Sequence, residues 1–122
     1  MTFRPAFVAA IAALVPLSAA AQEAQPPALT LEQRTMVHCA ATFALVANRQ
    51  QAGEQQALAF PDVGARGREY FVRAMASLMD QTGLGREAIA ALLKAEVGAL
   101  AEGEALAKAM PPCLVSLETS GL

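Results

Sequence analysis

Two cysteines and a single histidine are the residues of this 122-residue chain with the clearest capacity for chemistry. Cys39 directly follows His38, and a thiol beside an imidazole can act as an activated nucleophile. Neighbouring residues on a helix point about 100° apart, however, so these two side chains are not expected to share a hydrogen bond. The second cysteine, Cys113, offers Cys39 a partner instead. We therefore expect a structural disulfide between Cys39 and Cys113, and a partly exposed surface position for His38.

The same residues argue against a resident metal or haem. Two cysteines and one histidine fall short of the ligand set of a zinc site, and neither C-x-x-C nor C-x-x-C-H occurs. The carboxylates of Glu96, Glu102 and Glu104 are expected on a solvated helix face and a loop rather than in acid–base catalysis. The chain also lacks G-x-S-x-G and a glycine-rich phosphate loop after a strand. We expect no cofactor, no metal and no enzymatic activity.

A basic cluster with one tyrosine is the second feature that could bind something. Arg66, Tyr70 and Arg73 lie at i, i+4 and i+7, which places them on one helix face. Glu69 precedes Arg73 by four residues and is expected to pair with it. Two interpretations stay open: a solvated, salt-bridged face, or a patch for an acidic partner or an anionic headgroup.

The first 21 residues have the layout of a secretory signal peptide. Arg4 precedes an apolar run from Ala6 to Leu17, and Ser18-Ala-Ala-Ala21 then supplies small residues. The run is shorter than the roughly 20 residues that a membrane-spanning helix needs. We expect cleavage after Ala21, which exposes Gln22, with a cut after Ala20 as the alternative. The mature protein is then exported without a stable membrane anchor, to the periplasm in the first place, with an extracellular location also open.

Export affects both the cysteines and the charge. An even number of cysteines in an oxidising compartment indicates a disulfide, which here closes a loop over nearly the whole fold. Without Arg4, eight Lys and Arg residues stand against eleven Asp and Glu, so the formal charge moves from −2 to −3. A mildly acidic protein is a poor candidate for binding nucleic acid. A partner, if the protein has one, is expected to be another exported protein.

Helical periodicity accounts for most of the mature chain. Residues 22–29 hold two prolines and no periodicity, and predict a flexible lead-in to a single helical domain over residues 30–122. Thr30 and Gln33 form the pattern of a capping box. Long helices are expected over about 31–51, about 63–81 and from 85 or 86 to about 100. Residues 54–61 are either a helical turn or a loop, with Leu58 and Phe60 packing inward.

A break in the helical structure is expected in the C-terminal part of the chain. Pro111 and Pro112 predict a helix stop, followed by a short final helix from Cys113 to about Glu118. No strand pattern competes anywhere in the chain. The predicted fold is all-α: a small up-and-down bundle of three long helices plus a short C-terminal helix, closed by one disulfide.

Three stretches underlie a resemblance of the whole chain to a group of known proteins: Cys39-Ala-Ala-Thr-Phe43, Gly67-Arg-Glu-Tyr-Phe71 and Met110-Pro-Pro-Cys113. With the signal segment, they make the chain similar to small exported two-cysteine helical proteins of Gram-negative bacteria. These include acid-stress chaperones of the HdeA type and some secretion-system immunity proteins. The resemblance implies a periplasmic helical protein without assigning any functional residue.

Two functions are expected from these observations. The first is a non-enzymatic exported domain that binds a protein partner or acts as a stress-related, chaperone-like protein. The second is a helical bundle that binds a small molecule or lipid. Its cavity would be lined by apolar residues of three helices: Met36, Phe43, Phe71, Met75, Leu92 and Leu93.

Overall fold

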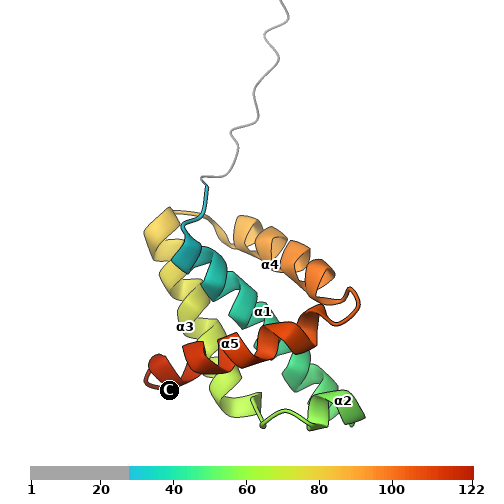
Figure 1. The fold of residues 1–122 in the computed structure, drawn as a ribbon. Helices are drawn as coiled ribbons and strands as arrows, with labels where there is room; N and C mark the ends of the chain where they lie inside the picture. The colour runs from blue at the N-terminus through green and yellow to red at the C-terminus, as the bar shows by residue number, and fades with distance from the viewer. Residues whose placement is uncertain (1–27) are drawn as a thin grey trace, which may run out of the picture.

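The computed structural model describes residues 28–122, and every regular element in that range is a helix. The helices are α1 (Leu31–Gln51), α2 (Gln55–Leu58), α3 (Gly64–Thr82), α4 (Arg86–Leu100) and α5 (Ala105–Thr119), as Figure 1 shows. The predicted all-α class is therefore confirmed for this part of the chain. The predicted signal peptide, its cleavage site at Ala21 and Gln22 and most of the lead-in lie outside the described residues. No helix between residues 28 and 122 combines the length and the apolar composition that a membrane span requires.

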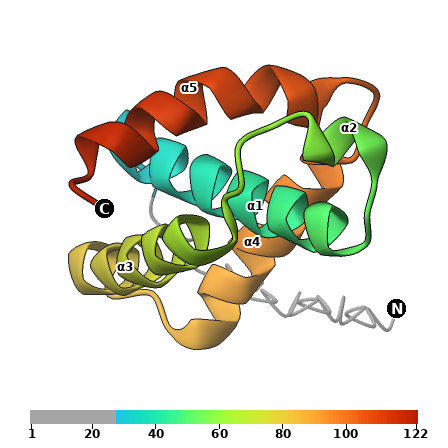
Figure 2. The same cartoon turned by 90° about the horizontal axis from the view of Figure 1, so that it is seen from below.

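The central helix is α1, which begins and ends where the sequence predicts. The Thr30 hydroxyl accepts a hydrogen bond from the Gln33 amide at 3.1 Å, and the Gln33 side chain accepts one from the Thr30 amide at 2.9 Å. This capping box satisfies amides that the first turn leaves unpaired. Figures 1 and 2 show α1 between α3, α4 and α5, and it contacts all four other helices. Its buried residues accordingly cover more than one face: Val37, Cys39, Ala40, Ala41, Thr42, Phe43 and Val46.

The contact between α1 and α3 depends on a glycine. A Cβ built on Gly67 would lie 2.9 Å from the Cβ of Phe43, closer than real Cβ atoms come to a neighbour. Gly67 therefore lets the two helix backbones approach each other at this crossing. One turn further along α3, the ring of Tyr70 packs edge-on against Phe43, with centroids 5.2 Å apart. Gly83 ends α3 in the left-handed conformation, at φ +70°, which is the usual role of a glycine after the last helical residue.

The predicted break at Pro111 and Pro112 is wrong. α5 runs without interruption from Ala105 to Thr119 through both prolines, and it is as long as α4. Each proline in a helix interior costs about 3 kcal/mol relative to alanine. Both prolines are exposed, and so are the residues four positions earlier, Ala107 and Lys108, whose carbonyls lose an amide donor. Burial of large apolar side chains, at about 1.5–3 kcal/mol each, offsets the cost along the opposite face. That face consists of Leu106, Ala109, Met110, Cys113 and Leu117.

The arrangement differs from the predicted three long helices plus one short helix. The described residues form five helices, of which the short one is α2 rather than the C-terminal helix. In Figure 1, α5 crosses α1 obliquely instead of lying along it. The C-terminal helix is long because its apolar face is unbroken and packs against the core along the whole helix.

The link between α1 and α3 is organised by Gln50. Its side-chain amide nitrogen donates to the carbonyls of Ala57, Phe60 and Pro61 at 3.1, 3.3 and 2.9 Å, and its side-chain oxygen accepts from the Val63 amide at 3.3 Å. This network holds α2 as a single turn.

The inward packing predicted for this link is only partly correct. Phe60 packs partly against the core. Leu58 is 51 % exposed, so its predicted inward position is wrong; Ala57 is the buried residue of α2. Leu58 directly follows Ala57, and neighbouring side chains of a helix point to different sides. The burial of Ala57 therefore leaves Leu58 facing solvent.

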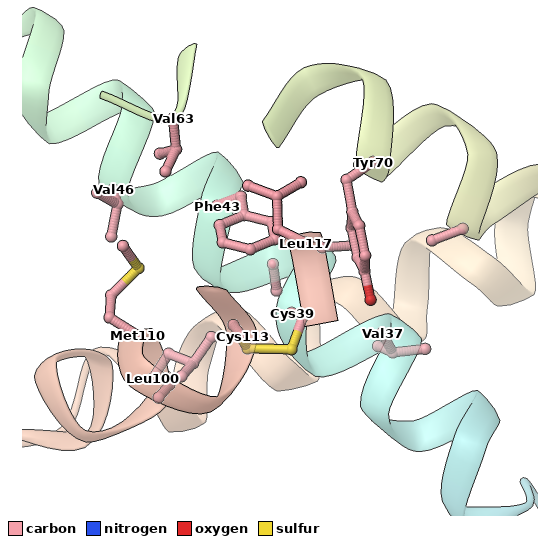
Figure 3. Packing of buried hydrophobic residues seen from close by; sticks show 14 of the residues in the cluster. Val37, Cys39, Phe43, Val46, Val63, Tyr70, Leu100, Met110, Cys113 and Leu117 are labelled. Atoms are coloured by element: carbon pink, nitrogen blue, oxygen red, sulfur yellow. A yellow bond between two sulfur atoms is a disulfide. The ribbon is translucent and has the colours of Figure 1, made fainter. Parts of the chain in front are cut away.

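The predicted disulfide between Cys39 and Cys113 is present and ties α1 to α5, with Cα atoms 5.1 Å apart. Figure 3 shows it within the apolar core, close to Phe43 and Leu117. Both cysteines are buried. The crosslinked residues are 74 positions apart, and a loop of that length corresponds to about 4.5 kcal/mol in the chain-entropy model. The disulfide therefore fixes α1 and α5 against each other.

Candidate functional site

A groove of about 770 Å³ lies where the start of α1, the middle of α3 and the end of α5 come together. These three segments meet at the left side of Figure 2. The groove is larger than the hollow of about 520 Å³ between the end of α1 and the segment before α3. Its lining combines apolar, hydroxyl and charged side chains: Leu31, Glu32, Thr35, Met36, Tyr70, Arg73, Ala74, Ser77, Ser116, Thr119, Ser120 and Leu122.

Tyr70 stands between the core and the groove. It is 7 % exposed, and its hydroxyl lies 2.9 Å from that of Ser116 on α5. Its ring packs against Phe43, as Figure 3 shows. The sequence interpretation placed Tyr70 in a basic surface patch. A spacing of four from Tyr70 to Ala74 and four more to Leu78, both buried, is the signal that would have placed it in the core.

The sequence interpretation did not place the hydroxyl groups around the groove together. They come from one helix face each of α1, α3 and α5, and only folding brings them together. Three of them donate their proton within their own helix. Thr35 donates to the Leu31 carbonyl at 2.9 Å, Thr119 to the carbonyls of Val115 and Ser116, and Ser120 to the Leu117 carbonyl.

Two charged side chains line the groove from opposite helices. Glu32 lies in the first turn of α1 and has no hydrogen-bond or ion-pair partner among residues 28–122. Arg73 of α3 donates to Glu69 at 2.6 Å, which confirms the predicted pair. The charge of the arginine is therefore compensated by its neighbour on the same helix, whereas that of Glu32 is not.

Arg66 lies apart from the groove lining and has its own partners. It donates to the Glu118 carboxylate at 2.8 Å and to the main-chain oxygen of Leu122 through two nitrogens. The hydrogen bond and the positive charge of Arg66 hold the pKa of Glu118 below its usual range. With Tyr70 buried, Arg66, Tyr70 and Arg73 do not share one open surface. A binding role for the two arginines stays a prediction.

His38 lies beside a carboxylate that the sequence interpretation treated as solvated. Its Nδ1 is 2.5 Å from Oε1 of Glu96, and the two side chains are 39 % and 29 % exposed. The partly exposed position of His38 is as predicted. The pair joins α1 to α4 and borders a hollow of about 290 Å³ together with Arg34 and Thr35. The adjacent Cys39 is in the disulfide, so it supplies no thiolate for a nucleophilic pair.

No group of three or more histidine, cysteine, aspartate or glutamate residues within the described range is placed to hold a metal ion. Glu102 and Glu104, the other carboxylates considered for acid–base chemistry, lie exposed around the link between α4 and α5.

The six apolar residues predicted to line one cavity are divided among different surroundings. Phe43 and Met75 are buried in the core, whereas Phe71 of α3 and Leu92 and Leu93 of α4 pack partly against it. Met36 lines the groove. These six residues therefore do not line the groove together, because Met36 is the one of the six that lines it.

Comparison of the chain with protein-family models, with curated proteins and with solved structures gave no match, and no family is shown for it.

Proposed function

We propose that residues 30–122 form an exported, non-enzymatic binding domain that holds a small, largely apolar molecule in the groove between α1, α3 and α5. The observation that carries the proposal is the groove itself. Its volume of about 770 Å³ falls within the range of about 300–1,000 Å³ that is usual for ligand pockets. Met36, Ala74 and Leu122 offer apolar contact, and the surrounding hydroxyls offer a few polar contacts.

The walls of the groove are held before any ligand arrives. The disulfide fixes α1 to α5, and the hydrogen bond between Tyr70 and Ser116 fixes α3 to α5. The close crossing at Gly67 fixes α1 to α3. A preformed site avoids the cost of ordering loops and side chains on binding, so a modest apolar contact area can give useful affinity.

The arrangement of the groove supports binding rather than reaction. Activation of a hydroxyl nucleophile needs a general base within hydrogen-bond reach. The hydroxyls of Thr35, Thr119 and Ser120 donate to main-chain carbonyls instead. His38 borders a different hollow, which it shares with Glu96.

Export is part of the proposal, and the disulfide supports it. Disulfides persist in oxidising compartments and are rare in the cytosol. The pattern of residues 1–21 adds the proposed route, with the periplasm as the first destination. Determination of the N-terminal residue of the protein isolated from the periplasm tests this part: we expect Gln22, and an intact Met1 in protein from the cytosol would contradict it.

Binding of a protein partner is the second candidate, and exposed apolar side chains favour it. Leu31 is 72 % exposed at the edge of the groove, Val115 of α5 is 63 % exposed and Val72 of α3 is 60 % exposed. An apolar segment of an exported protein would cover Leu31 while entering the groove. A chaperone-like activity would use the same contacts.

Native mass spectrometry of the protein from its exported compartment separates the two candidates. We expect a complex with a small molecule, and a Ser77→Trp variant, whose indole would fill the groove, should lose it. Ala76→Trp is the matched control, because Ala76 is the exposed neighbour on α3 and does not line the groove. A complex of protein mass would favour the second candidate. Unliganded wild-type protein, or a ligand that Ser77→Trp retains, would contradict the groove as the site.

A further inference from the structure

We infer that the ligand of the groove is an amphiphile whose polar end is a protonated amine, held at the start of α1 by Glu32 and Thr35. This inference rests on the proposed function and names the class of ligand for the same site. Two independent observations carry it: the direction of the hydrogen bonds around the groove and the balance of charge along it.

The hydroxyl groups of the groove are mainly acceptors. A serine or threonine hydroxyl has one proton to donate and two lone pairs to accept with. Thr35, Thr119 and Ser120 spend that proton on carbonyls of their own helices, so toward the groove they offer lone pairs. Ser77 accepts from Gln81 and keeps its proton, and the Tyr70–Ser116 pair keeps one of two. A ligand group rich in N–H donors matches this surface better than an acceptor does.

The charge balance also favours a cation. Glu32 carries a full negative charge without a side-chain partner among the described residues. The partial positive charge at the start of a helix is equivalent to about half an elementary charge, so it leaves the region around Glu32 net negative. Arg73, the one basic residue that lines the groove, is compensated by Glu69 at 2.6 Å. An ammonium group near Glu32 would therefore meet net attraction.

The spacing of the α1 residues supplies the amphiphilic pattern. Glu32 and Thr35 are three positions apart, so their side chains are neighbours on one face. Leu31 and Met36 flank that face with apolar surface. An ammonium group placed between Glu32 and Thr35 leaves the apolar part of the ligand to cover Met36 and Ala74.

The test compares three probes that share one chain and differ at the head: dodecylamine, 1-dodecanol and dodecanoate. Isothermal titration of the oxidised mature protein, at probe concentrations below self-association, should give the tightest binding for the amine and the weakest for the carboxylate. Glu32→Gln should weaken amine binding by about 1.5- to 5-fold, the range of an exposed ion pair, and leave 1-dodecanol unchanged. Glu87→Gln is the matched control. Glu87 is an exposed acidic residue in the first turn of α4, outside the groove.

The possible outcomes separate the inference from the function that underlies it. Equal or tighter binding of dodecanoate, or amine affinity that Glu32→Gln leaves unchanged, would overturn the inference while the groove stays a binding site. Absence of binding for all three probes would instead contradict the proposed function. An equal effect of Glu87→Gln would assign the preference to overall charge and also overturn the role of Glu32.

Discussion

The hydroxyl of Tyr70 lies 2.9 Å from that of Ser116, and this hydrogen bond connects α3 and α5 beside the groove. The Tyr70 ring at the same time packs edge-on against Phe43 of α1. One side chain therefore contacts all three helices that surround the proposed site.

Tyr70→Phe isolates the hydrogen bond, because it keeps the ring and its packing. We expect a loss of about 1 kcal/mol in the free energy of unfolding, the usual net contribution of one hydrogen bond. Urea denaturation of wild type, Tyr70→Phe, Ser116→Ala and the double variant measures it. A coupling energy near zero in this double-mutant cycle would mean that the two hydroxyls do not interact in solution.

Removal of the disulfide should have the largest effect of any change proposed for this fold. Cys39→Ala/Cys113→Ala is expected to lower the free energy of unfolding by about 2–5 kcal/mol, because the unfolded chain gains the freedom that the crosslink removed. Denaturation with and without reductant gives the measurement. Reductant should lower the midpoint of the wild type and leave the double variant unchanged. A wild-type denaturation midpoint that reductant leaves unchanged would contradict the disulfide.

Gly67→Ala tests the close crossing of α1 and α3. Alanine favours a helix over glycine by about 1 kcal/mol, but the new methyl group would lie 2.9 Å from the Phe43 Cβ, and overpacking costs about 1–3 kcal/mol. We expect net destabilisation. Gly98→Ala in α4 is the matched control, because nothing lies within 4 Å of its added Cβ; it should stabilise the protein. Stabilisation by both substitutions would show that the helices can move apart at Gly67 without loss.

The ion pair of Arg66 and Glu118 should contribute to stability in a pH-dependent way. Arg66 lowers the pKa of Glu118 in the folded protein, so the contribution is present above the usual glutamate range, near pH 4.3. It is lost as the pH falls through the lowered folded pKa. We expect Glu118→Gln to lower the urea midpoint slightly at pH 7, and to lower it less at pH 3 or in 1 M salt. Glu102→Gln, at an exposed position without a described partner, is the control. A shift of equal size at pH 7 and pH 3 would assign it to something other than this charge.

Local signals explain which parts of this fold could be predicted from sequence. The start of α1 follows from the capping box at Thr30, and the end of α3 from Gly83, because both depend on residues within one helical turn. The disulfide followed from counting cysteines and from the predicted export. Each of these features is decided by few residues.

Contacts between distant helices explain what could not be predicted. α5 continues through Pro111 and Pro112 because its opposite face is buried against the core, a tertiary contribution that exceeds local propensity. Tyr70 is buried because Phe43 and Ser116 lie beside it. The groove lining comes from segments separated by most of the domain, so no local pattern in the sequence marks it.

The placement of the groove walls sets an order of events in synthesis and folding. One wall comes from the start of α1, and another from the end of α5 and Leu122. The groove thus cannot form before the residues around Leu122 have been synthesised, because they supply one of its walls. If the groove binds a ligand as proposed, binding must follow the packing of α5, and occupancy of the groove would then report that α5 has folded onto α1 and α3.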